Sequence, residues 1–111
     1  MPKPRLLVLS GSTLFASFFD ATRQRRLGRA FRWARVDAAS AGPGLRRRLG
    51  DAEALVTTWD SPRLGDDLSD LAPRLRIVAH CGGEVKARFA RSLFSRLTIT
   101  NAPSPMAPYV A

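Results

Sequence analysis

Residues 75–86 read LRIVAHCGGEVK, and the apolar run IVAHC in this stretch ends at two adjacent glycines. A short continuous apolar run of this kind is typical of a β-strand that is covered on both faces, as in a parallel sheet. The chain contains five segments with strand character. They are Arg5–Ser10, Phe31–Val36, Glu53–Thr58, Arg74–Cys81 and Leu97–Thr100. Because helical or turn-rich segments separate them, the sequence predicts successive βαβ units and an α/β fold with a mostly parallel sheet.

The segments between these strands predict helices on both faces of the sheet. They are Leu14 to about Ala30, Leu45–Gly50, Asp66–Ala72 and, in part, Glu84–Ser95. The first has helical spacing in its opening turns and a polar gap at Thr22–Arg26. The last is predicted because Val85, Phe89 and Leu93 recur at four-residue spacing.

The composition indicates one compact globular domain. The chain has 111 residues, of which 45% are hydrophobic, too many for a disordered protein. No apolar run approaches the ~18 residues of a membrane-spanning helix, so no membrane interaction is expected. A single cysteine excludes an internal disulfide, and the run LLVL near the N-terminus is too short for a secretory signal. We therefore expect a soluble, cytoplasmic protein.

The formal net charge of +9 is carried by the first half of the chain. Residues 1–50 contain eleven Lys and Arg residues against two acidic residues, whereas residues 51–111 contain seven of each sign. Such a basic half suits either a solvated surface or a site for an anionic partner. Phe31 and Trp33 are the nearest aromatic residues, but no nucleic-acid-binding motif accompanies them. A basic protein associated with nucleic acid is therefore the weaker alternative, and nucleic acid is not an expected partner.

Three turns at the ends of predicted strands are the candidate binding segments. They are Ser10–Thr13, Thr58–Ser61 and Cys81–Glu84. In open α/β sheets, ligands bind outside the carboxyl ends of the strands. Gly82 and Gly83 could let backbone N–H groups approach a ligand without an intervening Cβ, although a tight turn would also explain them.

The His, Cys and Asp residues near these turns are candidates for catalytic or metal-binding groups. His80 and Cys81 are neighbours in a strand and point to opposite faces, so they cannot form a nucleophile–base pair. One His and one Cys fall short of a zinc site, and no metal is expected. Asp60 beside Trp59 is the best carboxylate candidate. The chain contains no GxGxxG or P-loop fingerprint for a dinucleotide.

The second half of the chain contains three ordered features: VTTWDSP at 56–62, PRLRIVAH at 73–80 and TITNAP at 98–103. Together they resemble the amino-terminal region of D-isomer-specific 2-hydroxyacid dehydrogenases. A Gly-containing loop follows the second feature, and the resemblance covers residues 53–111. It implies a flavodoxin-like substrate domain, an open parallel sheet of about five strands.

The resemblance also implies a function and a set of site residues. It implies hydride transfer between a small 2-hydroxy or 2-oxo acid and NAD or NADP, in a full-length enzyme that is a homodimer. The loop after the fourth strand offers main-chain N–H groups to the substrate carboxylate in this family. The corresponding substrate-binding positions are Trp59, Asp60, His80, Cys81, Gly82 and Gly83, with Asn101 at the interdomain crossing. Lys86 departs from the family, which commonly has Asp there.

The resemblance divides the chain into a substrate domain at 1–103 and a linker with the start of a truncated helix at 104–111. The NAD-binding domain and the catalytic Arg, Glu and His of the family would then lie outside this chain. No catalytic residue is assigned here, and the chain alone is expected to be inactive. The alternative is a stand-alone flavodoxin-like module that binds an anion or an acidic partner.

Overall fold

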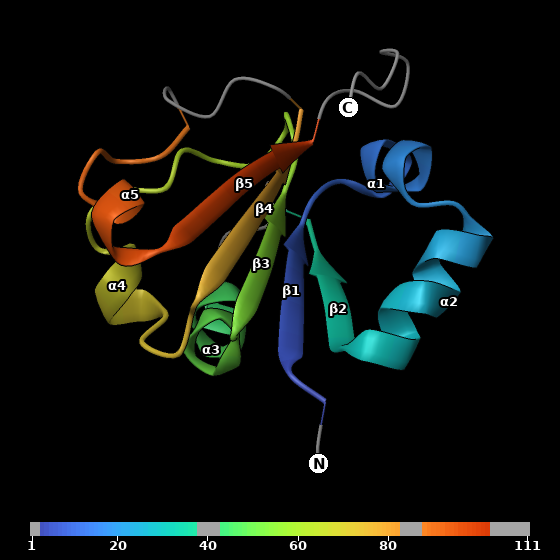
Figure 1. Ribbon diagram of the computed structural model, residues 1–111, viewed down its shortest axis with the longest axis horizontal. Coiled ribbons are helices and arrows are strands. Elements are labelled where there is room, and N and C mark those ends of the chain that lie inside the picture. Colours follow the sequence, from blue (N-terminus) through green and yellow to red (C-terminus); the bar gives the residue numbers. More distant parts are fainter. Residues whose placement is uncertain (1–2, 38–42, 83–87, 103–111) are drawn as a thin grey trace.

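The computed structural model describes residues 3–37, 43–82 and 88–102, and it contains one five-stranded parallel sheet. The strands are β1 (Arg5–Leu9), β2 (Arg32–Val36), β3 (Ala54–Thr57), β4 (Ile77–Cys81) and β5 (Thr98–Ala102). Their order in the sheet is β2-β1-β3-β4-β5, and all the arrowheads in Figure 1 point the same way. This is the flavodoxin-like strand order, so the predicted fold class is confirmed.

Helices cover both faces of the sheet. They are α1 (Ser12–Phe18), α2 (Ala21–Ala30), α3 (Pro43–Asp51), α4 (Leu68–Leu71) and α5 (Leu93–Arg96). On one face, Phe15 and Phe18 of α1 pack with Leu6 and Val8 of β1. On the other face, side chains of α3, α4 and α5 form the larger cluster. The alternation of side chains along each strand therefore builds two separate apolar layers.

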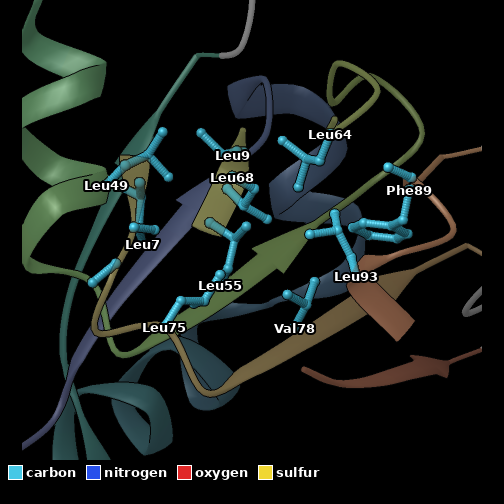
Figure 2. Close-up of a cluster of buried hydrophobic side chains, with 13 residues drawn as sticks. Leu7, Leu9, Leu49, Leu55, Leu64, Leu68, Leu75, Val78, Phe89 and Leu93 are labelled. Carbon is cyan, nitrogen blue, oxygen red and sulfur yellow. The ribbon is translucent and has the colours of Figure 1, made fainter. Parts of the chain in front are cut away.

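The larger apolar layer is rich in leucine, and Figure 2 shows it around the middle of the sheet. Leu7, Leu55 and Val78 stand side by side in register on β1, β3 and β4. Leu68 of α4 and Leu93 of α5 cover them and are almost completely buried. This layer fixes the positions of the three central strands, whose carboxyl ends carry the candidate site.

The segment after β1 forms two helices where the sequence predicted one interrupted helix. The break falls at Phe19 and Asp20, not at the polar stretch Thr22–Arg26, which lies inside α2. Asp20 is the N-cap of α2, and its side chain accepts a hydrogen bond from the backbone N–H of Arg23 at 2.8 Å. An aspartate at this position satisfies a backbone donor that a continuing helix would have paired internally, so it starts a new helix.

The segment Glu84–Ser95 is helical in part, as predicted: among its described residues, the end lies in α5. Residues 83–87 lie outside the described residues. Phe89 forms an isolated parallel bridge with Leu64, with N–H···O bonds of 2.8 Å on both sides of the pair. The four-residue spacing of Phe89 and Leu93 therefore reflects a shared burial in the leucine-rich layer. Helix α4 is also shorter than the predicted Asp66–Ala72.

Candidate functional site

The candidate site lies at the carboxyl edge of the sheet, where the connections from β1 and β3 leave in opposite directions. From β1 the chain runs to β2 on one side, and it then crosses over to β3 on the other side. The turn after β1, the loop Thr58–Ser61 after β3 and Gly82 after β4 all lie at this edge. In open α/β sheets this reversal of strand order is where ligands bind.

Asp60 ties the loop after β3 to the turn after β1. Its Oδ2 accepts a hydrogen bond from the backbone N–H of Gly11 at 2.8 Å, and its Oδ1 accepts one from the Thr58 hydroxyl at 2.5 Å. A Cβ on Gly11 would lie 2.6 Å from Oδ2, so only glycine allows this approach. The negative charge of Asp60 thus occupies the backbone donor that precedes α1.

This tether determines which ligands the turn after β1 can accept. A shallow hollow of about 510 Å³ opens beside the turn, and both Asp37 and Asp60 line it. Two carboxylates repel an anionic ligand. The backbone N–H that directly precedes α1, on Gly11, is already paired with Asp60. The turn after β1 therefore does not suit the phosphates of NAD or NADP.

Buried hydroxyl groups hold the loop after β3 in place. The Ser61 hydroxyl accepts a hydrogen bond from the backbone N–H of Thr58 at 2.8 Å and donates one to the Leu9 carbonyl. The oxygen of the Thr58 hydroxyl also lies 2.9 Å from that of Ser10, which is completely buried. These contacts satisfy the polar groups at the strand ends and fix the direction in which Trp59 leaves the loop.

Trp59 and His80 converge on Gly82. A Cβ built on Gly82 would lie 2.4 Å from Nε1 of Trp59 and 2.8 Å from Nε2 of His80. The backbone of Gly82 therefore leaves room for two ring nitrogens around one point. Trp59 is 47% exposed and its ring edge packs against Phe18, whereas His80 is 1% exposed. Trp59 is consequently at the surface of the protein, whereas His80 is fixed in the sheet.

The hydrogen bonds of His80 indicate its protonation state. Its Nδ1 lies 2.7 Å from Oγ1 of Thr57, and in the described part of the chain its buried Nε2 has no hydrogen-bond partner. Burial, followed by the positive charge of Arg88, lowers the pKa of His80 below its usual value. The imidazole is therefore neutral near pH 7. If the Thr57 hydroxyl donates to Nδ1, the ring proton is on Nε2, next to Gly82.

Arg88 is a residue of this site that sequence reasoning missed. Its guanidinium donates to the backbone carbonyl of Trp59 at 2.6 Å and to that of Ser61 at 3.3 Å. It thus anchors the Trp59 loop and places a positive charge near His80. Nothing in the sequence around Arg88 signals this contact, which depends on the bridge formed by Phe89. Thr57 was also missed, although a threonine at the end of a buried strand is a recognisable signal.

The remaining predicted site residues lie around this centre in different ways. Cys81 is buried in the apolar layer on the opposite face from His80, as the strand alternation predicted, and burial raises the pKa of its thiol. Asn101 is exposed on β5 and stands in register with His80. Gly83 lies outside the described residues. The structure therefore brings together Trp59, His80 and Gly82.

Among the described residues, no group of three or more His, Cys, Asp or Glu side chains could hold a metal ion. None of the helices in the described ranges combines the length and hydropathy needed to cross a bilayer.

We expect the stability of the protein to fall as the pH is lowered below about 6.5, the ordinary pKa of histidine. Between this value and the lowered pKa of His80 in the folded state, the unfolded chain binds a proton that the folded chain does not. The free energy of unfolding then decreases by at most about 1.4 kcal/mol per pH unit. Urea unfolding at pH 7, 6 and 5 measures this change.

His80→Gln is the control for this measurement, because His80 is the only histidine in the chain. The pH dependence between 6.5 and 5 should disappear in this variant, since the carboxylates titrate mainly below this range. An equally steep dependence in both proteins would contradict the assignment to His80.

Comparison with known proteins places this geometry in a recognised fold. No protein-family model matches the sequence, and no curated protein matches it. The chain is similar to the structure of 2-hydroxyacid dehydrogenase from Ketogulonicigenium vulgare Y25, with a TM-score of 0.65 and 22% identity over 93% of this chain and 30% of that one. It is also similar to a phosphoglycerate oxidoreductase from Rhizobium etli, with a TM-score of 0.66 and 14% identity. That match covers 91% of this chain and 30% of the other chain. The chain thus shares the fold of a portion of these proteins and spans less than a third of their length.

Proposed function

We propose that this chain is the substrate-binding part of a 2-hydroxyacid dehydrogenase-type oxidoreductase. The carboxyl end of β4 would receive the carboxylate of a small 2-hydroxy or 2-oxo acid. The observation that carries the proposal is the convergence of Trp59 and His80 on Gly82, beside the positive charge of Arg88. The fold shared with a dehydrogenase and an oxidoreductase supports the class of the reaction, and the sequence resemblance supports the position of the site.

Each group of the proposed site has a distinct role toward a carboxylate. The Nε2–H of His80 and the Nε1–H of Trp59 would donate hydrogen bonds to its oxygens, together with the backbone N–H groups of Gly82 and Gly83. A neutral imidazole suits this task when the Thr57 hydroxyl donates to Nδ1, because the ring proton is then on Nε2. Hydrogen bonds to a charged oxygen are about twice as strong as those between neutral groups.

Arg88 would act on the substrate through its charge and through the loop that it holds. Its hydrogen bonds to the carbonyls of Trp59 and Ser61 keep the indole over Gly82. Its positive charge favours an anion at the site and adds to burial in lowering the pKa of His80. Asp60 would serve as the tether described above, and Cys81 as the apolar backing of the strand.

The proposal assigns the nicotinamide cofactor and the catalytic residues to a part of the enzyme outside these 111 residues. The turn after β1 does not suit a dinucleotide, because Asp60 is already paired with the backbone N–H of Gly11. Hydride transfer requires the two reactants to be aligned closely, so the chain alone would bind substrate without reducing it.

The experiment that tests this function uses Trp59 as the reporter. In Trp33→Phe, Trp59 is the single tryptophan left, because the chain has two. We expect pyruvate to change its emission saturably and to bind about tenfold more tightly than propionate, which lacks the 2-oxo oxygen and its hydrogen bond. We also expect no oxidation of NADH when the chain is mixed with pyruvate.

Two results would overturn the proposal in different ways. Equal binding of pyruvate and propionate would favour the stand-alone anion-binding module, because such a site recognises only the charge. If neither acid binds saturably, the carboxyl end of β4 is not a carboxylate site.

A further inference from the structure

A second hollow lies at the opposite edge of the sheet, where β1 and β2 begin and α3 ends. Its volume is about 520 Å³. Four arginines from three elements line it: Arg5 of β1, Arg32 of β2, and Arg47 and Arg48 of α3. Asp51 is the single acidic residue in the lining, so positive charge dominates the hollow. We call it the arginine groove.

The register of the sheet places two of these charges side by side. Arg5 is the partner of Arg32 in the parallel pairing of β1 with β2. Neighbouring strands lie about 4.8 Å apart, and side chains two residues apart share a face. Both arginines therefore stand on the face of Leu7, which is the face that α3 covers through Leu49. Four like charges thus gather between β1, β2 and α3.

The groove lacks internal partners for its charges. Within the ranges that the structure describes, neither a salt bridge nor a side-chain hydrogen bond engages these four guanidinium groups. The nearby Glu53 carboxylate accepts its hydrogen bond from the backbone N–H of Arg5, at 3.1 Å, and not from the guanidinium. Like charges at close range repel one another, so an anion that enters the groove removes an unfavourable interaction.

The lining between the arginines leaves space for a ligand. Ala34 and Ala52 are small, and together with Leu7 they supply apolar surface within the hollow. The volume falls within the range of pockets that hold small organic molecules. An apolar lining with several cations is suited to a molecule that carries both a charged group and a less polar body.

We propose that the arginine groove binds the diphosphate group of a small molecule. The planar guanidinium group donates two parallel hydrogen bonds to one phosphate, and arginine is the preferred residue for such pairing. Four guanidinium groups exceed what one phosphate can engage in this way, so two linked phosphates match the site better. The groove lies at the amino ends of the strands, and the proposal is independent of the function assigned to their carboxyl ends.

Isothermal titration calorimetry of the full chain tests the proposal. We expect inorganic pyrophosphate to bind saturably at low salt, and inorganic phosphate to bind more weakly. Titration with ADP distinguishes the two sources of a diphosphate: tighter binding than pyrophosphate indicates an organic ligand, and weaker binding indicates the free anion.

Substitutions separate a built site from general positive charge. Arg47→Gln should weaken pyrophosphate binding about tenfold, the loss expected for one charge-assisted hydrogen bond. Arg46→Gln removes the same charge from the same helix at a residue that does not line the groove, and should change affinity less than twofold. Both arginines are exposed, so neither variant should affect folding.

Three outcomes would overturn the proposal. One is the absence of saturable binding by pyrophosphate and ADP, and another is an equal loss in Arg46→Gln and Arg47→Gln. The third is that a short DNA duplex binds more tightly than either diphosphate and that Arg47→Gln weakens DNA binding about tenfold as well. This result would assign the groove to nucleic acid.

Discussion

Gly82→Val is expected to lower the affinity for pyruvate by about 100-fold or more, the loss of two charge-assisted hydrogen bonds. A Cβ at this position would lie 2.4 Å from Nε1 of Trp59 and 2.8 Å from Nε2 of His80, closer than these atoms can approach. His80 is buried in β4 and cannot move away, so the valine side chain displaces the exposed Trp59 and also covers Nε2 of His80, which removes both donors. Titration of the variant in the Trp33→Phe background measures the loss.

Gly28→Ala is the matched control for this substitution. Gly28 lies inside α2, and a Cβ there would be 3.8 Å from Nε1 of Trp33, an ordinary contact. We expect unchanged affinity for pyruvate and a stability equal to or above that of the parent, because alanine favours a helix. Gly82→Ala places a Cβ at the same position as valine with less bulk, and serves if Gly82→Val does not fold. Parental affinity in a folded Gly82 variant would contradict the proposed position of the site.

Leu55→Ala is expected to reduce the free energy of unfolding by about 2–5 kcal/mol. Leu55 is 1% exposed in the central strand β3, between Leu7 of β1 and Val78 of β4 (Figure 2). Removing its side chain loses buried apolar surface and leaves a cavity among neighbours that belong to three strands and cannot collapse freely. Small domains have a free energy of unfolding of only about 5–15 kcal/mol, so this loss is a large fraction of the total stability. Urea unfolding at pH 7 measures the change.

Ile77→Ala provides the control for Leu55→Ala. Ile77 is also an aliphatic residue in a strand of the sheet, but it is 40% exposed. Its replacement should cost about 1 kcal/mol or less, since less apolar surface returns to water. An equal loss in both variants would show that strand propensity, and not the leucine-rich layer, dominates the stability of the sheet.

The sequence predicted the strands well because their apolar runs report burial on both faces. All five predicted strands are present, and the opposite orientation of His80 and Cys81 followed from simple alternation. The helices were predicted less well. Asp20 starts α2 through a local capping contact that competes with helical periodicity, and Phe89 is buried by a bridge to Leu64, not by a helix.

The candidate site was predicted in part, for a similar reason. Trp59 and Gly82 follow strands that end at the same edge, so their proximity could be expected from topology. The contacts of Thr57 and Arg88 depend on how two segments pack in three dimensions, which no spacing in the sequence reports. The arginine groove shows the same limit, because its four charges come from three elements. A count of basic residues in the first half of the chain could not place them together.

The crossover between β1 and β3 has a consequence for the order in which the sheet forms. The contact between Thr57 and His80, across β3 and β4, closes a separation of 23 residues, whereas that between Arg5 and Glu53, across β1 and the start of β3, closes 48. A doubling of loop length costs about 0.6 kcal/mol of additional chain entropy. We therefore expect the β3–β4 pair, and the β1–β2 pair that joins Arg5 to Arg32, to form before β1 docks against β3. Since β1 carries four almost fully buried residues, this docking would complete both apolar layers late, and we expect substitutions there to change mainly the rate of unfolding.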